Sequence, residues 1–201
     1  MCNMARPRHR LGNLPAETTS FVGRRRELAE IRKKLSTSRL VSLVGPGGVG
    51  KTRLALRAAA DLARGFADGA WLVELAEVRD GALVADAVLA ALDLRDQAVL
   101  TPMQILVSQL EDKQVLLVLD NCEHLIDAAA RLVLGVLRAA PRLRVIATSR
   151  EPLEVPGEQT VPLPPLDLPR EDGSAPSPTC SRTRPSCCSP SGRRRRQANS
   201  S

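Results

Sequence analysis

Hydrophobic positions follow two different patterns along the middle of the chain. Over residues 27–35 the apolar Leu28, Ile31 and Leu35 recur at helical spacing. Elsewhere short apolar runs such as residues 115–119 are typical of strands that are buried on both faces. The combined pattern predicts helices at 27–35, 53–63, 83–92, 103–110 and 125–139, and strands at 40–44, 70–75, 115–119, 143–148 and 159–163.

Alternating strands and helices predict an α/β fold, in which a parallel sheet lies between two layers of helices. Residues 1–16 are polar and basic and contain Pro7 and Pro15, so we expect a disordered lead-in. From Pro162 onward prolines are too dense for regular structure. We therefore expect one folded domain at 17–168 and a disordered basic tail at 169–201.

Composition changes this picture in three ways. The near absence of aromatic residues (1%) argues against stacking platforms for nucleic acid bases. The net charge of +7 is concentrated in the tail, where residues 171–201 hold six Arg and two acids, while the rest holds 23 basic and 20 acidic residues. The five cysteines lack zinc-ligand spacing, so we expect reduced thiols and a cytoplasmic location. No apolar run is long enough to span a membrane, and no signal peptide is visible.

Residues 45–52 read Gly-Pro-Gly-Gly-Val-Gly-Lys-Thr and match the Walker A pattern of a P-loop in full. A predicted strand precedes the motif and a predicted helix follows it. Glycines allow successive backbone N–H groups to surround phosphates, and the start of the helix adds further N–H donors. We therefore expect ATP binding with Mg²⁺, with nucleotide contacts from Gly45, Pro46, Gly47, Gly48, Val49, Gly50, Lys51, Thr52 and Arg53. In this prediction Lys51 reaches the β- and γ-phosphates and Thr52 offers a hydroxyl to the metal.

Asp120 ends the apolar run Val-Leu-Leu-Val-Leu and resembles the acidic residue of a Walker B strand. A buried strand of this kind delivers its last side chain to the carboxyl edge of the sheet, where ligands bind. Asp120 is thus the second predicted Mg²⁺ ligand, beside Thr52. The alternative is a solvated Asp at the end of a core strand.

The position after Asp120, where many P-loop ATPases carry an acid, holds Asn121, and the next acid is Glu123. Glu123 either polarises the attacking water or caps the helix that is predicted to begin near Leu125. Cys122 and His124 do not suggest a nucleophile and its base, because adjacent side chains in a turn usually diverge.

A further predicted strand ends in Thr148-Ser149-Arg150. The arrangement resembles a sensor strand, with Thr148 or Ser149 near the phosphates and Arg150 in reach of the γ-phosphate. The alternative is an exposed arginine that happens to follow a strand.

These motifs, in this order, resemble the nucleotide-binding domain of STAND-class P-loop ATPases, close to NB-ARC domains and to the ATPases within bacterial LuxR-type and SARP-type transcriptional regulators. The resemblance rests on residues 13–15 and 19–24, the P-loop, residues 117–125 and residues 147–153. It implies a three-layer P-loop NTPase sandwich, and it implies that Val22, Gly23 and Arg24 lie against the adenine and ribose.

The resemblance also implies a regulatory switch between ADP and ATP forms, with self-association of the ATP form. The class continues into a helical lid and a winged helix, which are not found here, and no helix-turn-helix has room. We therefore expect slow hydrolysis and no direct DNA binding. The alternatives are a P-loop enzyme of another class or a basic nucleic-acid-binding fragment. The guanine-reading motif Asn-Lys-x-Asp of a GTPase is absent.

The tail changes character where the resemblance stops. Family members continue with a helix similar to Ala-Val-x-Leu-Phe-x-Glu-Arg-Ala. When each codon's third base is read with the first two bases of the next, residues 182–193 can encode Asp-Ala-Ala-Val-Leu-Leu-Phe-Ala-Glu-Arg-Ala. We therefore expect that the tail from about Glu171 is an out-of-frame translation, and the coding DNA tests this.

Overall fold

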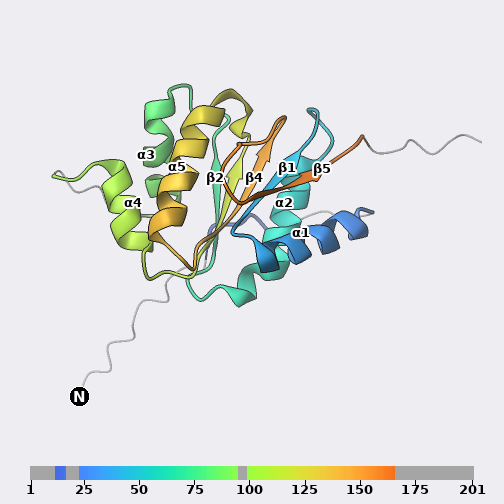
Figure 1. Ribbon diagram of the computed structural model, residues 1–201, viewed down its shortest axis with the longest axis horizontal. Coiled ribbons are helices and arrows are strands. Elements are labelled where there is room, and N and C mark those ends of the chain that lie inside the picture. The colour runs from blue at the N-terminus through green and yellow to red at the C-terminus, as the bar shows by residue number, and fades with distance from the viewer. Residues whose placement is uncertain (1–11, 17–22, 95–98, 166–201) are drawn as a thin grey trace, which may run out of the picture. The chain divides into compact units, whose positions relative to one another are not determined.

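The computed structural model describes residues 12–16, 23–94 and 99–165 (Figure 1). The chain divides into the unit Met1–Leu166 and a second unit, Asp167–Ser201, which lies wholly outside the described residues. The predicted tail and its reading frame therefore stay predictions. The helices are α1 (Arg25–Thr37), α2 (Lys51–Leu62), α3 (Val84–Ala91), α4 (Pro102–Leu110) and α5 (Ile126–Ala139), and the strands are β1 (Leu40–Val44), β2 (Ala70–Glu74), β3 (Leu116–Asp120), β4 (Arg144–Ser149) and β5 (Glu158–Pro162).

The five strands form one sheet in the order β2-β3-β4-β1-β5, and all neighbouring pairs are parallel. Because the strands are parallel, their carboxyl ends meet at one edge of the sheet. The order places β4 between β1, which leads into the P-loop, and β3, which ends at Asp120.

Helices cover both faces of the sheet, with α1 and α2 on one side and α3, α4 and α5 on the other (Figure 1). Side chains of each strand alternate between the two cores, so Leu117 and Leu119 pack with α3–α5 while Leu116 and Val118 pack with α1 and α2. The predicted α/β three-layer sandwich of the P-loop NTPases is confirmed.

The predicted elements are all present, with ends that differ by at most a few residues. Helix α4 begins at Pro102, one residue before the predicted start, and Thr101 and Gln104 form a capping box at its N-terminus. Strand β3 is entirely buried, as its apolar run predicted.

The segment 12–16 was predicted to be disordered, and that prediction is wrong. Gly12 forms a parallel bridge with Ala70 of the edge strand β2. The Asn13 side chain donates from Nδ2 to Leu72 O (2.9 Å) and accepts from Leu72 N at Oδ1 (2.6 Å). An amide side chain can thus form hydrogen bonds with the backbone of an edge strand as a neighbouring strand would. The polar composition of the segment did not predict these bonds. Residues 1–11 lie outside the described residues.

We predict that Asn13→Ala lowers the free energy of unfolding by about 1–2 kcal/mol, because it removes two hydrogen bonds to the backbone of Leu72. Urea unfolding measures the change. Gln159→Ala, which removes an exposed amide from the opposite edge strand β5, is the matched control and should have little effect. Equal stability of the two variants would contradict a stabilising role for the hydrogen bonds between Asn13 and Leu72.

Candidate functional site

The loop between β1 and α2 lies at the carboxyl end of β1. Gly48 and Gly50 have φ angles of 77° and 85°, in the left-handed region that favours glycine, and Gly50 is the N-cap of α2. No side chain caps α2, and its first turn contains no acidic residue. The helix therefore presents uncapped N–H groups and the positive end of its dipole to the loop.

Lys51 is the first residue of α2 and is 8% exposed. Its Nζ turns back over the loop and donates to Gly45 O (2.9 Å) and Pro46 O (3.1 Å). The ammonium group therefore lies against the backbone of the loop, in which Pro46, Gly47 and Gly48 are exposed.

The side chains of Asp120, Thr52 and Thr148, which belong to three different elements, form a hydrogen-bonded cluster. Asp120 Oδ1 accepts from Thr52 Oγ1 of α2 (2.7 Å) and from Thr148 Oγ1 of β4 (2.6 Å). Thr148 is 1% exposed, and its Oγ1 also accepts from Asn121 N (2.9 Å). The structure thus joins Asp120 to Thr52, as the predicted pairing requires. It also assigns Thr148 a partner, Asp120, that the sequence did not indicate.

Asn121 explains how the chain turns after β3. Its φ of 63° and ψ of 52° place it in the left-handed conformation, which asparagine tolerates better than most residues. The turn leads into the short 3₁₀ segment η3 (Cys122–His124) and directs Glu123 toward the P-loop. Among the described residues Glu123 Oε1 accepts from Arg150 and Oε2 accepts no hydrogen bond, so Glu123 does not cap α5, whose N-cap is Leu125.

Glu123 instead pairs with the two cations of the site. Its Oε1 accepts from Arg150 Nε at 2.9 Å, and its Oε2 lies 3.9 Å from Lys51 Nζ. The Glu123 side chain is 17% exposed, whereas the Arg150 side chain is 66% exposed. Arg150 therefore follows β4 at the rim of the P-loop, near Gly47, and is not an isolated surface arginine.

Gly23 and Arg24 precede α1, both with positive φ (85° and 51°). Arg24 Nη2 donates to Pro164 O (3.1 Å), and Arg24 Nη1 is buried without a hydrogen-bond partner among the described residues. The neighbouring Leu163 donates to Val44 O at the end of β1 (2.7 Å), so this segment runs alongside the start of the P-loop. Val22 lies outside the described residues, and Arg53 is exposed in the first turn of α2.

Cys122 and His124 point to different partners, which agrees with the prediction that they do not form a pair. Cys122 Sγ contacts Leu119 O (3.6 Å), and His124 Nε2 contacts Val78 O (2.7 Å). Burial, and secondarily the Asp120 carboxylate, raises the pKa of Cys122 to about 12. The thiol is thus protonated at neutral pH and is not a nucleophile.

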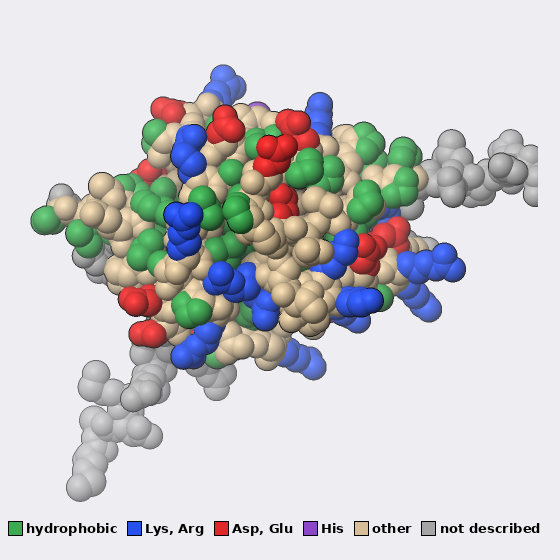
Figure 2. Space-filling model, viewed as in Figure 1, with side chains coloured by type: hydrophobic (Ala, Val, Ile, Leu, Met, Phe, Trp, Pro, Cys, Tyr) green, Lys and Arg blue, Asp and Glu red, His purple; other side chains and the backbone are tan. Residues whose placement is uncertain are grey.

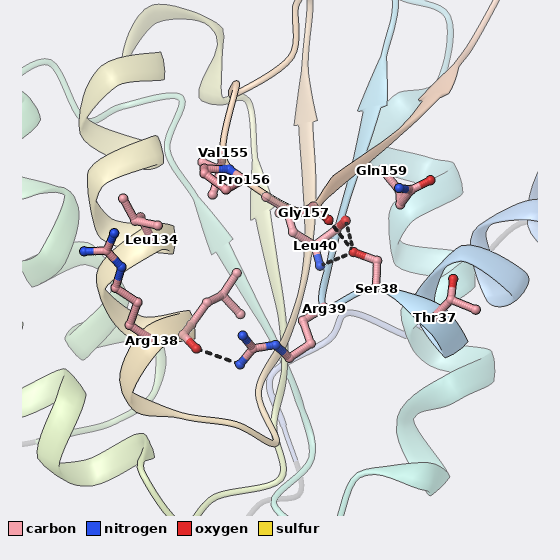
Figure 3. A pocket seen from close by; sticks show the side chains of 11 residues that line it. Thr37, Ser38, Arg39, Leu40, Leu134, Arg138, Val155, Pro156, Gly157 and Gln159 are labelled. Carbon is pink, nitrogen blue, oxygen red and sulfur yellow. Dashed lines mark hydrogen bonds between the residues drawn. The ribbon is translucent and has the colours of Figure 1, made fainter.

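A large hollow of about 660 Å³ lies away from this site, where β1 begins and α5 ends (Figure 3). Leu40, Leu137 and Val155 form its apolar part, and Arg39 and Arg138 belong to its lining. Figure 2 shows several basic side chains on the same face of the molecule. Arg39 Nη1 is held by Leu137 O (2.6 Å). None of the predicted site residues lines this hollow, so its size does not make it the functional site.

Within residues 12–16, 23–94 and 99–165, no group of three or more His, Cys, Asp or Glu side chains is arranged to hold a metal ion. A metal at the P-loop would therefore depend on Thr52, Asp120 and oxygens supplied by a ligand. No helix in the described part of the chain is long and apolar enough to cross a membrane.

The fold is that of a P-loop NTPase. Residues 24–161 match the model of the NB-ARC domain, and the chain belongs to this family. The fold is similar to that of a signal transduction ATPase with numerous domains (STAND protein) from Pyrococcus horikoshii, which has a tetratricopeptide repeat sensor. That likeness has a TM-score of 0.50 and 20% identity, and it covers 75% of this chain and 24% of the other.

Relatives with higher identity are longer proteins. An uncharacterized protein of Mycobacterium tuberculosis is 47% identical over 150 residues, which are 75% of this chain and 38% of the relative. A protein of the same organism that is named as an HTH-type transcriptional regulator is 43% identical, over 69% of this chain and 15% of the relative. The regulatory protein AfsR of Streptomyces griseus is 31% identical, over 68% and 15%. The chain thus spans well under half the length of these relatives.

We predict that Thr148→Val lowers the free energy of unfolding by about 2–3 kcal/mol, because the charged Asp120 loses a buried donor and Asn121 N loses its acceptor. Urea unfolding tests this, with Thr160→Val, at an exposed threonine of β5, as the matched control. Thr148→Ser keeps the hydroxyl and should recover most of the loss. Similar stabilities for Thr148→Val and Thr160→Val would refute the prediction.

We also predict that Cys122 resists iodoacetamide at pH 8 in the folded protein. Raising the pKa from 9.0 to about 12 lowers the thiolate fraction about a thousandfold. Peptide mass spectrometry of the Cys122 peptide measures alkylation, with the same protein in denaturant as the reference. Equal alkylation rates in the two states would contradict the buried thiol.

Proposed function

We propose that this domain binds ATP or ADP together with Mg²⁺ at the carboxyl edge of the sheet. The observation that carries the proposal is the 2.7 Å contact between Thr52 and Asp120. This contact brings the first turn of α2 to the end of the buried strand β3, although β3 does not pair with β1, the strand that precedes α2. A hydroxyl and a carboxylate in contact beside a phosphate-binding loop are the oxygen donors that Mg²⁺ prefers.

The residues present fit a nucleoside di- or triphosphate. The uncapped start of α2, together with the loop 45–50, supplies backbone N–H donors, and Lys51 supplies a positive charge within the loop. In the proposed complex Thr52 and Asp120 hold the metal, which neutralises phosphate charge. Gly23 and Arg24 line the adenine and ribose side, while Arg53 supports the phosphates from the first helical turn.

Glu123 and Arg150 complete the proposed site at the γ-phosphate. Glu123 lies 3.9 Å from Lys51, the residue that meets the terminal phosphates in P-loops, and Arg150 pairs with Glu123. We propose that Glu123 orients and polarises the attacking water when the protein hydrolyses ATP, and that Arg150 stabilises charge on the γ-phosphate.

The relatives support a regulatory role for this site. Two of them are named as regulators, and this chain covers 15% of each. We propose that the domain serves as the nucleotide-dependent switch of a larger regulatory architecture, and that the ATP form self-associates. Sedimentation of the protein with Mg-ADP and with a Mg-bound non-hydrolysable ATP analogue tests this, and identical monomer sedimentation in both states would argue against it.

We predict that Mg-ADP raises the melting temperature of the protein by about 5–10 °C at a hundredfold excess over its dissociation constant. Because the ligand binds only the folded state, it raises the free energy of unfolding by about 2.7 kcal/mol at this excess. Lys51→Ala should remove most of this shift, because the cation inside the loop is lost. Thermal scanning with and without nucleotide gives the measurement.

Lys33→Ala, at an exposed lysine of α1, is the matched control and should keep the wild-type shift. If Lys51→Ala retains the full shift, the role of Lys51 at the phosphates is refuted.

We predict that Asp120→Asn removes the Mg²⁺ dependence of nucleotide binding while the protein stays folded. The amide keeps an oxygen that accepts from Thr52 and Thr148 but lacks the charge that the metal requires. Titration with ADP in Mg²⁺ and in EDTA should then give similar affinities. Asp127→Asn, at an exposed acid of α5, should retain the wild-type difference. An unchanged Mg²⁺ effect in Asp120→Asn would exclude Asp120 as the metal ligand.

A further inference from the structure

One carboxylate, that of Glu123, serves both cations at the phosphate end of the proposed site. Its Oε1 accepts from Arg150 Nε at 2.9 Å, and its Oε2 lies 3.9 Å from Lys51 Nζ. Oε2 is buried and accepts no hydrogen bond from the described residues. Its negative charge is therefore balanced mainly by Lys51 and Arg150.

A nucleoside triphosphate needs the same positive charges. The lysine of a P-loop reaches the β- and γ-phosphates, so the γ-phosphate approaches Lys51 from the space beside Glu123. Two negative groups that share this cation repel each other, and the low exposure of the side chains of Glu123 (17%) and Lys51 (9%) limits screening by water. A diphosphate lacks the γ-phosphate and leaves the contact between Glu123 and Arg150 in place.

We propose that Glu123 sets the choice between the two nucleotides, because its charge lowers the affinity for the triphosphate relative to the diphosphate. This inference rests on the proposed nucleotide site and goes beyond it by naming the residue that biases the switch toward the diphosphate form. Binding of the triphosphate must separate Glu123 from Arg150, after which Arg150 is available to the γ-phosphate.

The other charged groups around Glu123 do not supply this discrimination. Asp120 is held by Thr52 and Thr148 and faces the proposed metal. Glu151 follows Arg150 directly in the chain but is exposed. Glu123 alone contacts both cations among the described acidic residues.

Calorimetric titration of the full chain with Mg-ADP and with the non-hydrolysable analogue Mg-AMP-PNP tests the proposal. Glu123→Gln keeps the side-chain shape and an oxygen that can accept from Arg150, but it removes the charge. We expect the affinity for AMP-PNP to rise about tenfold and the affinity for ADP to stay within about twofold. Glu151→Gln is the matched control and should leave both affinities at the wild-type values.

The outcomes separate this proposal from the proposed function. If the wild-type protein binds neither nucleotide, both fail. If it binds both, and Glu123→Gln leaves the ratio of affinities unchanged or lowers it, the discrimination by Glu123 is overturned while the nucleotide site stands. Slower hydrolysis without a change in AMP-PNP affinity would assign Glu123 to the attacking water alone. Glu123→Ala, which also removes the charge, should shift the ratio in the same direction and provides a second variant if the amide impairs folding.

Discussion

The position of β4 between β1 and β3 is the constraint on which the site depends. The P-loop follows β1 and Asp120 ends β3, and these two strands do not pair with each other. Thr148 of the intervening strand β4 donates to the same carboxylate oxygen of Asp120 as Thr52 does. A buried carboxylate that lacked these donors would be costly, because the charge would have left water without compensation. The hydrogen-bonded cluster therefore holds three elements in register at the carboxyl edge.

The charged groups at this edge form two sets of contacts. Asp120 accepts from the hydroxyl groups of Thr52 and Thr148, whereas Glu123 pairs with Lys51 and Arg150. The arrangement keeps both cations close to where phosphates would bind and gives each a partner. Such a balance would suit the nucleotide-dependent switch proposed above.

The two edges of the sheet are each protected, by different means. At β2 the Gly12 bridge and the Asn13 side chain occupy backbone groups of the strand. At β5 the ammonium group of Lys34 donates to Thr160 O (2.5 Å), and Pro162 ends the strand without an N–H donor. Covered edges of this kind discourage pairing with strands of other molecules. Any self-association of the domain would then use side-chain surfaces rather than a continued sheet.

Much of the fold could be predicted from the sequence because it rests on local patterns. The apolar runs mark the buried strands, the helical spacing of Leu28, Ile31 and Leu35 marks α1, and the spacing of glycines before Lys51 marks the P-loop. These features depend only on residues that are close together in the chain, so they can be recognised in the sequence alone.

The tertiary structure decided what depends on residues far apart in the chain. It paired Thr148 with Asp120, turned Glu123 toward Lys51 and Arg150 instead of capping α5, and placed Asn13 against an edge strand 59 residues away. The contact of Thr148 with Asp120 depends on the strand order, and the position of Glu123 follows the left-handed turn at Asn121, neither of which is encoded by a local periodicity. The sequence by itself determined which elements form and where the glycine-rich loop lies, because helical, strand and loop preferences act over a few residues. Only the packed sheet determined which side chains meet, because hydrogen bonds and ion pairs act over a few ångströms and not along the chain.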